Sequence, residues 1–360
     1  MNNRELCVID DAQPLRPSKA SIPDGPDKEF IKKKLADLSQ TQFGRFPGAN
    51  PVSIERQDLH TIKKDGFVVS LKSDGIRNLL LLTHDESNSP IAILIDRSFK
   101  MFEIEIWASP SYFQEGSLFD GELIWDYSRD PCPRLAFLVF DIIILEGKVQ
   151  NIPYYDRLQL VHNLLVTNMN QTDEDIERII CEEKKICSIH NHMDLVLYPK
   201  KFVTLENLRE LWSMRTSSPY RNDGLIFTKN SGSITKGTTK DSLKWKPDHT
   251  IDVLAVLTDT NWKIWIGYVD QWVDMTKEVK VNDNVLIVEF HHNDLLKCIA
   301  ERYRCPLILE CLCKLQDNSL HVFCVKERHD KSTPNSLFTV QKTILNVIEN
   351  IDIEEILSLI

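Results

Sequence analysis

One lysine of the sequence stands where a strand pattern ends in a tight turn. Lys72 closes the apolar run that begins at Phe67 and is followed by Ser-Asp-Gly-Ile-Arg, so its amine can project from a rigid sheet edge. Gly75 permits the turn and the close approach of a phosphate. A lysine amine attacks only when it is deprotonated, and burial beside other cations favours that form. The segment predicts a covalent nucleophile, with a solvated lysine beside an Asp-Gly hairpin turn as the alternative.

Two further lysines could supply the neighbouring cations. Lys244 and Lys246 alternate along a strand pattern, and a period of two places both ammonium groups on one face. The alternative is that this face is simply the one that meets water. Asp141 lies in a long apolar run, where an unpaired carboxylate costs several kcal/mol and so needs a metal ion or a cation. Phe140 beside it lies in the same apolar run, where a phenylalanine is normally part of the core.

The string Lys-Ser-Asp-Gly-Ile-Arg at 72–77 resembles the nucleophile motif of the covalent lysyl-nucleotidyltransferases. That superfamily contains the mRNA capping enzymes and the DNA and RNA ligases. Further segments resemble its remaining motifs in the expected order: 119–123, 137–141, 223–227, 243–247 and 326–331. The last match departs from the family pattern, because Lys326 replaces an expected arginine and Val322 an expected tryptophan.

The resemblance implies a two-step transfer of GMP from GTP. Lys72 would attack the innermost phosphorus and leave a covalent lysyl-GMP. Phe140 and Ile226 would cover the two faces of the base, and Lys200 would donate to the guanine O6. The nucleotide-binding residues that it implies are Asp74, Arg77, Glu122, Phe140, Lys200, Ile226, Lys244, Lys246, Arg328, Asp330 and Lys331. A Mg²⁺ or Mn²⁺ ion would be held through Glu122, Asp141 or Asp223.

Two features favour capping over ligation. The segment Phe-Pro-Gly-Ala-Asn-Pro-Val-Ser at 46–53 resembles one that capping enzymes carry ahead of the nucleophile and that ligases lack. Asp223 also stands where ligases usually carry glutamate. The resemblance therefore implies an mRNA guanylyltransferase that acts on a 5′-diphosphate RNA end. An ATP-dependent polynucleotide ligase is the alternative. A non-catalytic phosphopeptide-binding module is disfavoured, because a binder does not need every phosphate-handling cation.

Partners follow from the same resemblance. The sequence has no His-Cys-x5-Arg phosphatase loop, so an RNA 5′-triphosphatase is expected as a separate subunit. A cellular host implies the nucleus and the phosphorylated C-terminal tail of RNA polymerase II, whereas a viral origin implies the cytoplasm or the virion.

Composition sets broad limits. The 360 residues favour two domains of unequal length. A net charge of -10 argues against holding long nucleic acid by bulk electrostatics, so phosphate contacts should be local. The nine cysteines include no CxxC pair and predict reduced, mostly buried thiols. No apolar run has the length of a signal peptide or membrane span, which predicts no membrane association.

The elements that must position these residues predict an α+β fold. Short strands separated by turns favour antiparallel sheets flanked by helices, followed by a C-terminal OB-fold barrel. The resemblance implies that the first part is a ligase-like nucleotidyltransferase domain. The expected domains are a mobile arm over 1–26, the nucleotidyltransferase domain over 27–248, an OB-fold lid over 249–335 and a C-terminal helix over 336–360 that packs back on the nucleotidyltransferase domain. Asp248 marks the expected hinge. Helices are also predicted over Asp173–Lys185 and over Leu205–Met214, the latter capped by Thr204.

Overall fold

The computed structural model describes residues 21–128, 133–166, 190–191, 195–258, 261–292, 306–329 and 331–359. The chain divides into two compact units: unit 1 is Met1–Val52, Ile62–Lys244 and Ile360, and unit 2 is Ser53–Thr61 and Trp245–Leu359. The division after Lys244 lies close to the boundary predicted at residue 248. The sequence did not predict that residues 53–61 belong to unit 2. Residues 1–20 of the predicted arm and the predicted helix over 173–185 lie outside the described residues.

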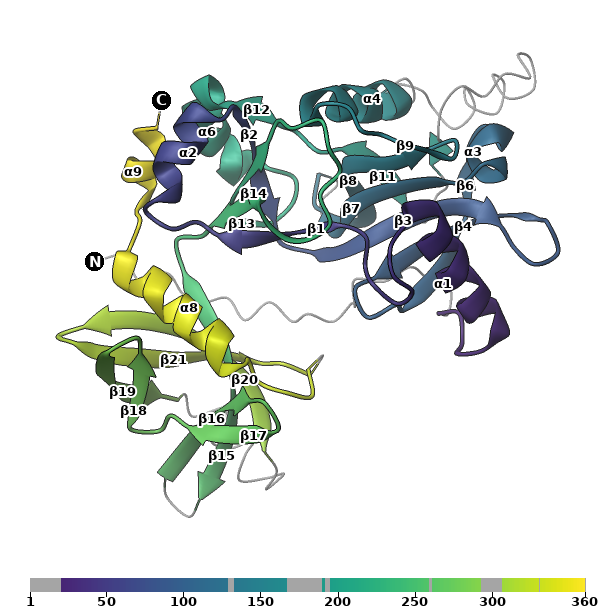
Figure 1. The fold of residues 1–360 in the computed structure, drawn as a ribbon. Helices are drawn as coiled ribbons and strands as arrows, with labels where there is room; N and C mark the ends of the chain where they lie inside the picture. Colours follow the sequence, from purple (N-terminus) through teal and green to yellow (C-terminus); the bar gives the residue numbers. More distant parts are fainter. Residues whose placement is uncertain are drawn as a thin grey trace. The chain divides into compact units, whose positions relative to one another are not determined.

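Unit 1 is built on two sheets (Figure 1). The larger has the order β11-β8-β7-β3-β4-β5, with β9 paired to β8, and only β11 runs parallel to its neighbour among the described strands of this sheet. Its strands are β3 (Ile76–His84), β4 (Pro90–Asp96), β5 (Met101–Ile104), β7 (Ser117–Asp126), β8 (Arg134–Leu145), β9 (Lys148–Val149) and β11 (Val196–Pro199). The smaller has the order β1-β14-β13-β2-β12. Its strands are β1 (Ala49–Ser53), β2 (Phe67–Ser73), β12 (Val203–Thr204), β13 (Asn222–Lys229) and β14 (Gly237–Trp245), and β6 (Ile106–Trp107) pairs separately with β10 (His190–Asn191).

Helices cover both faces of the larger sheet (Figure 1). On one face, Val161 and Leu164 of α4 (Tyr154–Val166) pack with Leu80 and Phe119. On the other face, Leu35 of α1 (Pro26–Ser39) packs with the alternate residues of β3. Successive side chains of a strand point to opposite faces of the sheet, and both faces are covered by helices here. Both sets of β3 side chains are therefore buried, which explains why the β3 sequence is a continuous apolar run rather than an alternating one.

The remaining elements of unit 1 are short. They are α3 (Pro110–Gln114), η1 (Leu205–Asn207), α6 (Leu208–Ser213) and η2 (Met214–Ser217), while α2 (Asp58–Lys64) spans the division between the units. The helix predicted over 205–214 is thus two 3-10 turns around a single short α-helix. Thr204 was expected to cap it, but its side chain makes no cap hydrogen bond. The helix α4 was not predicted.

Unit 2 is a curled sheet of seven strands in the described residues, ordered β17-β16-β15-β20-β21-β19-β18. Its strands are β15 (His249–Thr258), β16 (Asn261–Tyr268), β17 (Gln271–Asp274), β18 (Glu278–Val281), β19 (Asn284–His291), β20 (Leu307–Gln316) and β21 (Ser319–Glu327). The sequence pattern predicts strands at Ile251–Leu257, Lys263–Val269, Asn284–Phe290, Leu307–Leu315 and His321–Lys326, which correspond to all of these except β17 and β18. The α+β fold class is as predicted, and closure of this sheet as an OB-type barrel stays a prediction.

The C-terminal segment differs from the single helix that was expected. It forms α8 (Leu337–Glu349) and α9 (Ile353–Leu357), separated at Asn350, whose φ of 44° ends α8. Ser336 caps α8 as the sequence suggested, because its side chain accepts from the Thr339 amide. Val340 and Ile344 of α8 are buried in the core of unit 2, so the structure packs this helix on the C-terminal sheet (Figure 1). The expectation that the C-terminal segment packs back on the nucleotidyltransferase domain stays a prediction.

In the described part of the chain, no helix is both long and apolar enough to cross a membrane.

A prediction concerns Gly75, which joins β2 to β3. A Cβ at this position would lie 2.3 Å from the Leu123 carbonyl oxygen and 2.7 Å from Ile124 Cγ2, both on β7. Backbone cannot yield as a flexible side chain does, so Gly75→Ala should lower the free energy of unfolding by roughly 2 kcal/mol. Chemical denaturation measures this. Gly232→Ala is the matched control, because its Cβ would meet only the Asn151 carbonyl oxygen at 4.0 Å. Equal stability of the two variants would contradict the close approach.

Candidate active site

Lys72 lies opposite a bulge in the neighbouring strand. Asn222 pairs with Ser73 and Leu225 pairs with Leu71, so two residues of β13 face the single residue Lys72 of β2. A bulge leaves an extra residue unpaired and redirects its side chain. Asp223 is one of the two, and its carboxylate accepts a hydrogen bond from Lys72 Nζ at 2.8 Å. Both side chains are partly exposed, at 23% and 33%, so the pair is reachable from solvent.

A second lysine lies deeper. Lys200 follows β11, is 9% exposed and donates from Nζ to Ser73 Oγ at 2.9 Å. Burial lowers its pKa to about 8, although the charge of Glu122 opposes the shift. Burial also raises the pKa of Glu122, while Lys200, Lys72 and Arg77 act in the opposite direction. The site is therefore a mutually dependent set of cations and carboxylates within unit 1.

Phe140 is a bulge residue as well. Gly121 pairs with Val139 and Asp120 pairs with Asp141, which leaves Phe140 as the extra residue of β8. Its ring is half-buried and lies 5.4 Å from the Arg77 guanidinium carbon and 5.5 Å from Lys200 Nζ. A ring presented among cations can accept a stacked base, which suits its predicted role.

Arg77 is anchored rather than free. Its guanidinium donates to both carboxylate oxygens of Asp120 and to the Ala49 carbonyl oxygen, and it lies over the Phe46 ring. A Cβ on Gly48 would collide with this guanidinium. The 46–53 segment, noted in the sequence only as a signature, thus forms part of the wall that holds Arg77 in place.

Asp141 has a cation as its partner. Arg157 of α4 donates from Nε to one oxygen at 2.7 Å and from a terminal nitrogen to the other at 3.1 Å. Burial raises the pKa of Asp141, and Arg157 acts against that shift. Of the two partners that the sequence left open, a metal ion or a cation, the structure supplies the cation. A metal-binding role for Asp141 stays a prediction.

The other predicted residues of unit 1 are distributed around this cluster. Asp74 is exposed in the turn after Lys72, and its amide donates to the Arg221 carbonyl oxygen. Ile226 is half-buried on β13 opposite Ser70, and Lys244 is half-buried on β14.

The predicted residues of unit 2 are described within that unit. Lys246 directly follows β14. Arg328 donates to Asp252 at 3.1 Å and lies 3.4 Å from Glu310, and Lys331 also donates to Asp252. Asp252 is buried and holds both cations in one place. Asp330 lies outside the described residues.

Sequence reasoning missed several members of the site. Ser73 and Asp120 hold Lys200 and Arg77, and Asp252 holds the cations of unit 2. Arg97 was also missed; partial desolvation and the charge of Arg77 lower its pKa, while Glu122 and Asp120 raise it. Ser73 and Asp120 lie inside matched motifs and could have been included on that ground. Nothing in the local sequence marks Arg97 or Asp252.

A comparison with protein families identifies the family of this chain. A family model described as mRNA capping enzyme, catalytic domain, matches residues 20–248, which include every predicted residue of unit 1. The chain belongs to the mRNA capping enzyme family. Lys72, Glu122, Phe140 and Asp223 thus lie in the catalytic-domain match of a capping-enzyme chain.

Curated capping enzymes resemble the chain at low to moderate identity. It is 30% identical to the mRNA-capping enzyme subunit alpha of Schizosaccharomyces pombe over 249 residues, which cover 64% of this chain and 58% of that protein. It is 27% identical to the mRNA-capping enzyme of Danio rerio over 354 residues, 91% of this chain and 51% of that protein. The chain thus spans between half and six tenths of the length of these relatives.

Among solved structures, a mycobacterial DNA ligase D complexed with ATP and MES aligns with 81% of this capping-family chain and 97% of its own. The TM-score is 0.41 and the identity 13%.

The lowered pKa of Lys200 gives a pH prediction. Its amine should become neutral as pH rises through about 8, so its rate of acetylation should rise over the same range. In the protein unfolded by denaturant, the same lysine should titrate near the ordinary ~10.4. Because the unfolded chain then binds the proton more tightly, the contribution of Lys200 to the free energy of unfolding should increase with pH between those values. Competitive labelling with mass spectrometry tests this, and coincident profiles for folded and unfolded protein would contradict it.

The Arg157–Asp141 pair yields a stability prediction. Arg157→Met should cost about 3 to 5 kcal/mol, because it leaves a buried carboxylate without its cation. Adding Asp141→Asn should recover part of that loss, since the uncompensated charge disappears. The control is Lys229→Met, which breaks the more exposed pair with Asp65 and should cost less than about 1 kcal/mol. Additive effects of the two site substitutions in denaturation would contradict the coupling.

Proposed function

We propose that the chain is an mRNA guanylyltransferase that transfers GMP from GTP, through a covalent lysyl-GMP, to a diphosphate RNA end. The observation that carries the proposal is the position of Lys72, within a capping-family match, opposite a bulge that presents Asp223 2.8 Å from its amine. The charges of Lys72, Lys200 and Arg77 all act on the Glu122 carboxylate, so these groups belong to one cluster. A reachable lysine among phosphate-attracting cations suits attack on a nucleotide phosphate.

The ion pair with Asp223 has to break before Lys72 can attack. An ammonium that donates to a carboxylate is the protonated form, and only the free amine is a nucleophile. A triphosphate held by the nearby cations would compete for the Lys72 ammonium, and attack then requires that the ammonium give up a proton. Asp223 is placed to receive or relay that proton.

The purine is proposed to lie between Phe140 and Ile226. Phe140 projects from its bulge beside the two cations, and Ile226 is half-buried on β13. Base-on-ring stacking contributes on the order of 1 to 3 kcal/mol. Lys200 is the proposed donor to the guanine O6, and its hydrogen bond to Ser73 fixes where its ammonium points.

The carboxylates of unit 1 fit a divalent cation to different degrees. Mg²⁺ and Mn²⁺ prefer oxygen ligands. Glu122 and Asp223 both lie among the residues that would meet the phosphates, and each offers carboxylate oxygens there. Asp141 fits less well, because Arg157 occupies both of its oxygens. When bound, such an ion would offset charge on the phosphates.

The finer assignments rest on the family. The phosphates are proposed to contact Lys244, Lys246, Arg328, Asp330 and Lys331. The proposed partners are a separate RNA 5′-triphosphatase and the phosphorylated tail of RNA polymerase II. The curated relatives are eukaryotic, and a nuclear location is proposed on that basis. An ATP-dependent polynucleotide ligase remains the second candidate, because the lysine motif at 72–77 is common to both classes.

The discriminating experiment supplies α-labelled GTP and α-labelled ATP to separate samples. GTP should label the protein, and the label should then move to 5′-diphosphate RNA but not to a nicked duplex with a 5′-phosphate. Lys72→Ala should reduce labelling by at least about 10³-fold, because the covalent bond cannot form. Lys201→Ala, which changes an exposed lysine next to the buried one, serves as the control and should label normally. Labelling by ATP with sealing of the nick would replace the proposal with the ligase.

A further inference from the structure

A group of metal-ligand side chains lies in unit 2, on strands that the proposed function does not use. Glu289 and His291 occupy alternate positions of β19, and His321 lies on the adjacent strand β21. The two strands run parallel, and the register places Glu289 directly opposite His321. Between them, Val288, Leu320 and Val322 are buried in the core of the unit. The three ligand-type residues therefore share the outer face of the sheet.

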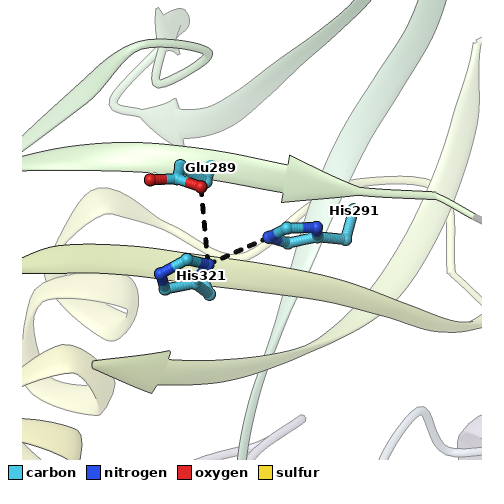
Figure 2. A group of neighbouring side chains, drawn as sticks. All are labelled: Glu289, His291 and His321. Carbon is cyan, nitrogen blue, oxygen red and sulfur yellow. Dashed lines mark hydrogen bonds and ion pairs between the residues drawn. The ribbon is translucent and has the colours of Figure 1, made fainter. Parts of the chain in front are cut away.

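The distances among their ligand atoms suit a small cation. His291 Nε2 lies 3.0 Å from His321 Nδ1, and His321 Nδ1 lies 3.6 Å from a Glu289 oxygen (Figure 2). All three ligand atoms lie within 4.8 Å of one another. Bonds of ~2.0 to 2.1 Å from nitrogen or oxygen to a tetrahedral Zn²⁺ place neighbouring ligand atoms about 3.3 Å apart. One of the two observed distances is shorter than this value and the other is longer. Modest rotation of the side chains would therefore bring the three ligand atoms to bonding distance of one ion.

The surroundings hold the imidazoles in place. The His291 ring stacks on Phe323 at 4.4 Å with planes 13° apart, and on His321 at 5.2 Å. Phe323 is the residue directly opposite His291 in the register, so the stack is a product of the strand pairing. Rings held by stacking lose less conformational entropy when they bind a metal. Glu289 adds the negative charge that two neutral imidazoles lack.

We propose that Glu289, His291 and His321 form a Zn²⁺-binding site on the outer face of the C-terminal sheet. Two imidazoles and one carboxylate match the nitrogen and oxygen ligands that Zn²⁺ takes, and three protein ligands leave a fourth position for water. The site joins β19 to β21, the parallel junction at which the β18–β19 hairpin meets the rest of the sheet. Metal binding to the folded state alone would therefore stabilise that junction.

The buried thiols of the same unit are poor competitors for the ion. Burial raises the pKa of Cys313 to about 12, and hydrogen bonding with Cys324 together with burial raises the pKa of Cys311 further. Only thiolates bind Zn²⁺ well, so burial and the raised pKa values make these two thiols weaker candidate ligands than the exposed face of the sheet.

The test uses the full chain without a polyhistidine tag. Equilibrium dialysis against Zn²⁺, with bound metal counted by mass spectrometry, should give one ion per chain, and Co²⁺ should give the visible absorption of a tetrahedral complex. His291→Gln and His321→Gln should each weaken Zn²⁺ binding at least tenfold and remove the zinc-dependent rise in Tm. Mg²⁺ should produce neither effect, because it prefers oxygen ligands in octahedral geometry.

Two control variants fix the location. His329→Ala changes an exposed histidine outside the cluster and should bind Zn²⁺ as the natural chain does. Glu122→Gln alters the candidate active site of unit 1 and should also leave the count unchanged, which separates this site from the proposed function. Matching Tm values in the presence of chelator establish that the histidine variants are folded. Absence of zinc binding at micromolar concentration, or unchanged binding in both histidine variants, would overturn the proposal.

Discussion

The ion pair between Lys72 and Asp223 is the interaction on which the site depends. It forms where β13 carries one residue more than β2, so that Asp223 and Gly224 both lie opposite Lys72 and the Asp223 carboxylate accepts a hydrogen bond from its amine. The pair orients the Lys72 ammonium, and in the proposed function it has to break before the amine can attack.

Opposite charges also compensate one another in the rest of the unit 1 cluster. Lys200 and Asp120 are buried and Glu122 and Arg77 are half-buried, and each charge would be costly alone because desolvation penalises an isolated charge. Together they compensate one another, and they leave Lys200 with a pKa of about 8 and Glu122 with a raised one. In the proposed function, a bound triphosphate would add its negative charge to this compensated set. The overall net charge of -10 is compatible with this, since the cations are concentrated locally.

Local sequence predicted what depends on local pattern. The strands of unit 1 follow from apolar runs such as the one through Leu79–Leu82, and the Ser336 cap follows from a serine ahead of an apolar periodic segment. The position of Lys72 at the end of a strand was likewise visible. By contrast, the bulges at Asp223 and Phe140 depend on how two strands pair, and the residue types near Phe140 do not predict a bulge.

The same limit explains the residues that were missed. Arg157 reaches Asp141 only because α4 packs against β8, and that helix was not predicted. Arg328 and Lys331 were predicted from their motif. Asp252 accepts hydrogen bonds from both, but it lies 76 residues before Arg328 in the chain, so the motif does not include it. His291 and His321 meet through a parallel pairing that the alternation of either strand does not specify. The break at Asn350, which turned one expected helix into two, depends on a left-handed backbone conformation that asparagine tolerates.

The most direct measurement is the location of the covalent nucleotide. After the natural chain is incubated with GTP, proteolysis under alkaline conditions and tandem mass spectrometry should find a single GMP, joined through a phosphorus–nitrogen bond to the lysine at the end of β2. Attachment to Lys200, the buried lysine that follows β11, would contradict the role proposed for Lys72.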